Sequence, residues 1–117
     1  MPTPTLTLAL QNLTPTSVAP GGAVVVTDVT TCVPNSPIAS TVTAIDFYLG
    51  VTKDQPAGAT TLTNKNVSPL APGQSYTRPD GARGLTIPAS VAAGPRWIIA
   101  RLRQYPAVIN SVALTIN

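Results

Sequence analysis

A short turn phrase occurs three times in this chain and constrains its fold more than any other feature. The phrase is an apolar residue, then Ala, then Pro or Ala, then Gly. The copies are Val18–Gly21, Leu70–Gly73 and Val91–Gly94. Pro at the first central position of a β-turn presets φ, and Gly at the second accepts the positive φ of a type II turn. A β-type run follows each copy, at residues 23–27, 74–77 and 96–100. The chain therefore turns sharply and starts a strand, repeatedly, which is typical of an antiparallel sandwich.

Alternation of apolar and polar residues predicts seven strands between the turns. The predicted strands are residues 5–13, 23–31, 41–50, 60–67, 74–87, 96–104 and 108–116. The fifth is a strand pair or one strand interrupted at Pro79-Asp80-Gly81. The segment 60–67 is polar and predicts an edge strand, on which Lys65 discourages edge-to-edge pairing. Because no stretch keeps a helical period, we predict one all-β, seven-stranded, antiparallel, immunoglobulin-like β-sandwich over residues 1–117, with 1–5 as an extended arm.

Composition argues against several functions. The chain has one cysteine, Cys32, so an immunoglobulin-type disulfide is excluded and a buried spare thiol is expected. It has no His and no Glu, and its four Asp are well separated in sequence. Acid–base catalysis, a catalytic thiolate and a metal site all need such groups close together, so we expect no enzyme, no metal and no cofactor. The charge of +3 includes no dense basic cluster, which disfavours nucleic acid, and no apolar stretch suits membrane insertion.

The turn-and-strand phrases together resemble the bacterial cell-adhesion-related domain called CARDB. The phrases that carry the resemblance, in chain order, are 18–22 (VAPGG), 47–49 (FYL), 70–75 (LAPGQS), 85–88 (LTIP) and 91–94 (VAAG). The match extends over about residues 5–103. It implies a seven-stranded immunoglobulin-like sandwich without a catalytic site. The chain departs from the family after the sixth strand, where Arg101, Arg103 and Gln104 stand in place of an acidic, Asn-rich segment.

The sixth predicted strand contains the main candidate binding residues. If Ile98, Ala100 and Leu102 face the core, the alternate residues from Trp97 to Arg103 share the outer face. These candidates are Trp97, Ile99, Arg101 and Arg103. Trp and Arg are enriched among interface anchors, so this face predicts a protein partner. The alternative is that Trp97 turns inward at the rim and the two arginines are solvated.

A second candidate is the turn 78–84, in which Arg78 and Arg83 flank Pro79-Asp80-Gly81. Two arginines on a rigid turn can bind a carboxylate, although a mobile loop tip is the alternative. The arm 1–5 contains Pro2 and Pro4, is extended for that reason, and is expected to lie across a neighbouring subunit.

These features predict a non-enzymatic structural or binding module with a protein partner. Met1 is not followed by a signal peptide, so we expect either a chain that is not exported through a cleavable signal or a domain taken from a longer protein. The preferred hypothesis is a phage capsid decoration protein on the virion surface. The alternative is a CARDB-type adhesion or spacer module at a bacterial cell surface. A carbohydrate-binding accessory domain is a third hypothesis, for which only Tyr48, Tyr76, Trp97 and Tyr105 offer aromatic rings. Self-association into a closed oligomer is open in each case.

Overall fold

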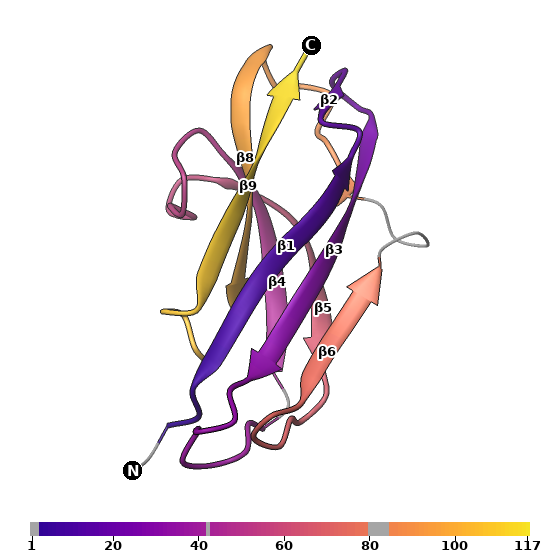
Figure 1. Cartoon of the computed structure of the whole chain (residues 1–117). Helices are drawn as coiled ribbons and strands as arrows, with labels where there is room; N and C mark the ends of the chain where they lie inside the picture. Colours follow the sequence, from indigo (N-terminus) through magenta and orange to yellow (C-terminus); the bar gives the residue numbers. More distant parts are fainter. Residues whose placement is uncertain (1–2, 42, 80–84) are drawn as a thin grey trace.

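A computed structural model describes residues 3–41, 43–79 and 85–117 of the chain. These residues form two packed β-sheets, with strands over 55% of the chain and no helix in the described part (Figure 1). The four-stranded sheet has the order β1 (Leu6–Thr14), β3 (Ala23–Cys32) and β6 (Ser75–Pro79), with β7 (Leu85–Thr86) also paired to β3. The five-stranded sheet has the order β2 (Ser17–Val18), β9 (Ile109–Ile116), β8 (Gly94–Leu102), β4 (Thr43–Gly50) and β5 (Thr60–Val67).

The all-β, two-sheet, disulfide-free architecture is confirmed, but its strands divide differently from the prediction. The described residues contain nine strands, because β2 was not predicted and because the predicted segment 74–87 contains two separate strands, β6 and β7, as the strand-pair alternative expected. The pairing is also not wholly antiparallel, since β2 runs parallel to β9. After β1 the chain crosses to the other sheet, where the backbone oxygens of Thr16 and Val18 accept hydrogen bonds from Thr115 N (3.0 Å) and Asn117 N (2.8 Å). The short strand β2 thereby pairs with the last two residues of β9, Thr115 and Ile116, at the edge of the sheet.

The first two turn phrases form the predicted type II turns. Gly21 has φ 84° and Gly73 has φ 90°. The bonds that close these turns join Gly22 N to Ala19 O and Gln74 N to Ala71 O, each at 2.9 Å. Gly supplies the positive φ without the steric cost that a Cβ would bring.

The third phrase does not close in the same way. Gly94 has φ 136° and is the first residue of β8, while Pro95 after it has no N–H with which to close a turn. The Arg96 side chain binds the carbonyls here instead, donating to Ala92 O (3.1 Å) and Pro95 O (2.8 Å). The prediction of a third type II turn was therefore wrong, because the residue after the phrase is a proline.

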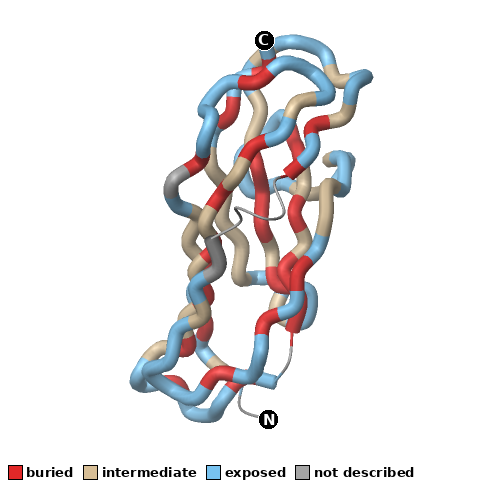
Figure 2. Tube along the Cα trace, turned by 90° about the vertical axis from the view of Figure 1, so that its right-hand side faces the viewer, coloured by how far each residue is buried: buried red, intermediate tan, exposed pale blue. Residues whose placement is uncertain are grey.

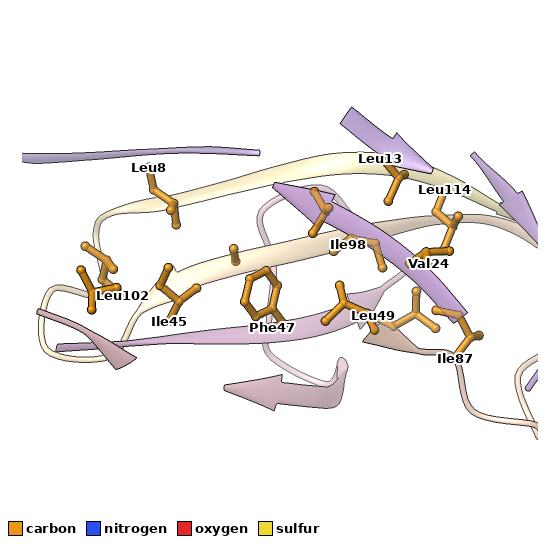
Figure 3. Close-up of a cluster of buried hydrophobic side chains, with 14 of the residues drawn as sticks. Leu8, Leu13, Val24, Ile45, Phe47, Leu49, Ile87, Ile98, Leu102 and Leu114 are labelled. Atoms are coloured by element: carbon orange, nitrogen blue, oxygen red, sulfur yellow. The ribbon is translucent and has the colours of Figure 1, made fainter. Parts of the chain in front are cut away.

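The core lies between the sheets and consists of side chains from alternate positions of the long strands. Figure 2 shows this alternation as buried positions separated by exposed and intermediate ones along the strands, and Figure 3 shows the side chains filling the space between the sheets. The predicted inward residues of the third and sixth predicted strands are confirmed; Ile45, Phe47, Ile98, Ala100 and Leu102 are fully buried. Burying each of the large apolar side chains stabilises the folded state by about 1.5–3 kcal/mol. Cys32 is also buried, as expected.

The segment 60–67 forms an edge strand, as predicted, but Lys65 does not protect that edge. Strand β5 ends the five-stranded sheet, and its Lys65 is only 2% exposed. In the register of β4 and β5, Lys65 lies opposite Ile45, a core residue, so both side chains point inward. The lysine that was expected to be exposed at the sheet edge is therefore buried in the core.

The molecule is elongated, with extents of 44 × 27 × 17 Å. The described chain enters at one end of the long axis and leaves at the other, at Asn117 (Figure 1). The start of β1 is held at the entry end, where Thr5 N donates to Ser36 Oγ (2.9 Å) and Val33 N donates to Thr5 O (3.1 Å). The described residues include no helix long and apolar enough to cross a bilayer.

Candidate partner-binding face

The candidate residues of the sixth predicted strand lie on the outer face of the five-stranded sheet. In the antiparallel register of β4 and β8, Arg101 lies opposite Asp46, Ile99 opposite Tyr48, and Trp97 opposite Gly50. Paired residues of antiparallel strands project to the same face. Because Ile98, Ala100 and Leu102 are buried in the core, the residues between them face outward, as predicted. We call the set Asp46, Tyr48, Trp97, Arg101 and Arg103 the outer-face cluster.

Arg103 lies one residue beyond β8 and forms an ion pair with Asp46. Its Nη2 donates to Asp46 Oδ1 at 2.7 Å, and its Nε donates to Asp46 Oδ2 at 3.3 Å. This is the two-point arrangement that a planar guanidinium makes with a carboxylate. The hydrogen bond and the charge of Asp46 raise the pKa of Arg103. The Arg103 side chain is 53% exposed, so water screens the pair and its charge is already matched within the chain.

Arg101 is held more deeply and has a different partner. Its Nη2 donates to the Tyr48 hydroxyl at 3.3 Å, and its guanidinium carbon lies 5.6 Å from the centroid of the Tyr48 ring. The Nε of Arg101 is buried without a hydrogen-bond partner in the described part of the chain. No carboxylate of the described residues pairs with Arg101. It is therefore an oriented, half-buried cation whose charge is not balanced by an ion pair.

Ile99 does not belong to the exposed surface, contrary to the prediction. It faces outward from the sheet but is fully buried. The loop 51–59 folds back over this part of β8 and β9. Asp54 N donates to Ser111 Oγ (3.0 Å), which in turn donates to Asp54 Oδ1 (2.5 Å), and Ser111 lies opposite Ile99 in the sheet. A Cβ at Gly50 would lie 2.9 Å from Ile99 Cδ1 and 3.3 Å from Ala59 Cβ, so Gly50 permits this close packing.

Trp97 is half-buried at the margin of the same loop. The Nζ of Lys53, which is exposed, lies 5.7 Å from the centroid of the Trp97 ring. This is within the range of a cation–π contact. The loop thus separates Trp97 from Arg101 by covering Ile99, so the two side chains do not form the continuous stripe that the sequence predicted.

Of the second predicted site, the structure describes only the backbone of Arg78 and Pro79. Arg78 is in β6 of the four-stranded sheet, where its backbone lies opposite Asp28 of β3. Arg83 and the turn residues 80–84 lie outside the described residues, so the predicted arginine pair has no described geometry. The arm is described from Thr3 onward, and Thr5 is tied to the loop at Ser36 of its own chain. The expectation that the arm crosses a neighbouring subunit stays a prediction.

The sequence prediction missed a buried ion pair between the sheets. Lys65 Nζ lies 2.6 Å from Asp28 Oδ2, and each side chain is 1% exposed. Lys65 Nζ also lies 4.6 Å from the centroid of the Phe47 ring. A signal was available, because Asp28 continues the inward alternation of Val24 and Val26 along one strand. An acidic residue on an inward position predicts a buried cation opposite it.

The three described aspartates all have partners within the chain. Asp28 pairs with Lys65, Asp46 with Arg103, and Asp54 with Ser111. Within the described ranges, no three His, Cys, Asp or Glu side chains gather as metal ligands would. The four aromatic residues proposed for a carbohydrate platform are also dispersed. Tyr48 and Trp97 lie on the outer face, Tyr76 is in β6, and Tyr105 is in the turn between β8 and β9.

Comparison with known proteins shows a likeness of fold. No protein-family model matches the chain. No curated protein matches it either. Among solved structures, it is similar to part of a β-glucosidase from Listeria innocua in complex with isofagomine, with a TM-score of 0.62 and 14% identity over 97% of this chain and 16% of that one. It is also similar to part of DesR, a β-glucosidase from Streptomyces venezuelae in complex with D-glucose, with a TM-score of 0.56 and 14% identity over 97% of this chain and 15% of that one. This chain therefore spans less than a fifth of either β-glucosidase.

Proposed function

We propose that this chain is a non-enzymatic structural and binding module with an immunoglobulin-like sandwich fold, which docks on an acidic protein surface through its outer-face cluster. The observation that carries this proposal is Arg101. It is half-buried, oriented by the Tyr48 hydroxyl, and not paired with a carboxylate of the described residues. A partner carboxylate that reached Arg101 would form a charge-assisted bond with a donor that is already positioned.

The residue types of the chain, and the way its described aspartates are engaged, support a binding role over an enzymatic one. The chain contains no His and no Glu, and the three described aspartates are each engaged by a neighbouring side chain. The β-glucosidases that share the fold are much longer proteins, of which this fold is a small part. Their catalytic activity therefore provides no reason to assign one to this chain. The dispersed aromatic rings likewise give no support to a carbohydrate platform.

Of the two settings predicted from the sequence, the position of the chain ends favours the adhesion or spacer module. Modules joined in line must pass the chain from one end of each domain to the other. Here the described chain enters at one end of a 44 Å long axis and leaves at the opposite end (Figure 1). A CARDB-type module at a bacterial cell surface would use this geometry to hold its outer-face cluster at a fixed spacing from its neighbours.

The phage capsid decoration hypothesis is supported by a different feature. A shallow apolar groove at the entry end is lined by Pro4, Leu6, Tyr105, Pro106 and Val108. Proline and aromatic side chains give a rigid apolar surface that would rest on a capsid shell. In that setting the same end of the molecule would be buried on the particle and the outer-face cluster would contact an adjoining subunit.

The deciding experiment measures binding of the purified chain to two fractions of its native source, cell envelopes and sedimented particles. Both docking proposals predict that Arg101→Glu together with Arg103→Glu abolishes binding to whichever fraction retains the wild type. Arg101→Glu alone should account for most of the loss, because Arg103 is already paired with Asp46. A single anchor of this kind contributes about 2 kcal/mol or more, roughly a 30-fold loss of affinity.

A matched control is Arg96→Glu, which changes the net charge equally at the far end of β8. It should keep its affinity, since the Arg96 guanidinium is engaged by the backbone carbonyls of Ala92 and Pro95 and is not part of the outer-face cluster. If Arg101→Glu binds as tightly as the wild type, the outer-face cluster is not the docking surface.

A further inference from the structure

The buried ion pair joins the two sheets across the core. Asp28 is in β3, which lies between β1 and β6 in the four-stranded sheet, and Lys65 is in β5, the edge strand of the five-stranded sheet. Lys65 Nζ and Asp28 Oδ2 are 2.6 Å apart, although 37 residues separate the two in sequence. Each side chain is 1% exposed. An amine and a carboxyl group are thus held in contact in an interior that excludes water.

The surroundings of this pair are largely apolar. The Phe47 ring lies 4.6 Å from Lys65 Nζ, and Val24 and Val26 share the inward face of β3 with Asp28. Figure 3 shows Phe47 between Ile45 and Leu49 in the core. Two full charges are costly in such a place. Transfer of one proton along the hydrogen bond gives a neutral amine and a neutral carboxylic acid, which are the forms that react with each other.

We propose that Lys65 and Asp28 form a self-modification site, at which the folded chain makes an intramolecular amide bond between Lys65 Nζ and Asp28 Cγ. After the proton transfer, the nitrogen lone pair attacks Cγ and forms a tetrahedral intermediate. The nitrogen then passes a second proton to the hydroxyl oxygen of the intermediate, the C–O bond to that oxygen breaks, and the oxygen leaves as water with both transferred protons. One ammonium and one carboxylate become one amide and one water, so no oxidant, reductant or co-reactant is needed.

Two features of the fold favour this step. The sheets hold the reacting groups together, and fixed proximity of this kind replaces a bimolecular encounter with an effectively unimolecular reaction. The product removes both charges from the core, while an amide needs only ordinary hydrogen bonds. The Thr30 hydroxyl, two residues from Asp28 on the same inward face, is buried without a hydrogen-bond partner among the described residues. We assign to Thr30 the positioning role of donating a hydrogen bond to the departing oxygen.

Intact mass spectrometry of the full folded chain tests the proposal directly. The wild type should be lighter than its sequence mass by one water molecule. Tryptic digestion should then fail after Lys65 and yield a branched peptide, in which the segment containing Asp28 is joined to the segment containing Lys65. Folded wild-type protein that keeps its full mass after prolonged incubation, and is cleaved after Lys65, would overturn the proposal.

Three variants separate this reaction from other sources of water loss. Lys65→Met should keep its full mass, whereas Lys53→Met, at the exposed lysine, should still lose water. A succinimide at Asp80-Gly81 would also release water, but it would do so in Lys65→Met as well, and that result would contradict the proposal. Thr30→Val should form the amide more slowly, and an unchanged rate would remove Thr30 from the mechanism. None of these outcomes depends on docking, so this inference stands or falls separately from the proposed function.

Discussion

The chain contains two described ion pairs of nearly the same length in opposite environments. Lys65 and Asp28 approach to 2.6 Å with both side chains 1% exposed, while Arg103 and Asp46 approach to 2.7 Å with side chains 53% and 15% exposed. At the surface, water screens the attraction and the pair contributes little to stability. In the core, each partner has lost its water, and the close contact between the two charges offsets part of that cost. Distance alone therefore says little about the energetic role of an ion pair.

Whether each aspartate is buried depends on whether its position in the strand points inward or outward. Asp28 occupies an inward position of β3, in line with Val24 and Val26. Asp46 stands between Ile45 and Phe47, which both point into the core, so its own side chain points outward. A shift of one residue in either strand would exchange these environments. One pair therefore links the two sheets through the core, and the other lies on the outer face of one sheet.

The largest expected effect comes from breaking the buried pair on one side. Lys65→Met removes the cation that lies 2.6 Å from the buried Asp28 carboxylate, which should lower the free energy of unfolding by about 3–5 kcal/mol. If the wild type carries the proposed amide bond, the loss of that constraint adds about 4 kcal/mol for a loop of this length. Chemical denaturation monitored by circular dichroism measures the difference.

The matched control is Lys53→Met, which removes the other lysine of the chain. Lys53 is exposed and makes one long contact with the Trp97 ring. Its replacement should change the free energy of unfolding by about 1 kcal/mol at most. If the two methionine variants were equally stable, the contrast between buried and exposed charges would not hold in this protein.

A second, intermediate effect is expected when both buried partners are replaced. Asp28→Leu combined with Lys65→Met substitutes apolar side chains for the ions and leaves neither charge unpaired. This double variant should be more stable than Lys65→Met alone by roughly 3 kcal/mol, because apolar replacements of a buried pair are often neutral. The difference in free energy of unfolding between this double variant and the wild type then measures the contribution of the proposed covalent bond, because neither chain has an unpaired buried charge. A double variant as stable as the wild type would mean that no covalent bond had been lost.

Local sequence features predicted much of the fold. The Pro-Gly pairs at 20–21 and 72–73 form type II turns because the turn depends on its own four residues. The alternation of apolar and polar residues correctly predicted that Phe47 and Ile98 point inward, because the alternation of side chains depends on one strand alone. The third phrase does not form a type II turn, and the reason is again local. Pro95, the next residue in the sequence, has no N–H to close the turn.

The features of the site that were missed depend on contacts between distant segments. Ile99 is buried because Asp54 bonds to Ser111, 57 residues away, and draws the loop 51–59 over it. From the sequence, Lys65 is expected to be an exposed lysine that protects a sheet edge. Its burial depends on Asp28, which the opposite sheet places 2.6 Å from it. Periodicity gives the side of a strand on which a residue lies, but it does not say what covers that side. For that reason the outward orientation of Arg101 was predicted, while its Tyr48 partner was not.

The smallest expected effect is at the exposed pair. Arg103→Met should leave the thermal unfolding midpoint close to that of the wild type, because the side chain is 53% exposed and its attraction to Asp46 is screened. The Asp46 contact raises the pKa of Arg103, so any stability that it contributes is present below the ordinary arginine value and is lost only as the pH rises through the raised one. The variant and the wild type should therefore show the same stability difference at neutral and mildly alkaline pH, measured by thermal unfolding at low salt. A large loss of stability, or one that changed between those conditions, would show that Asp46 and Arg103 are coupled to the core, and the two pairs would no longer belong to different classes.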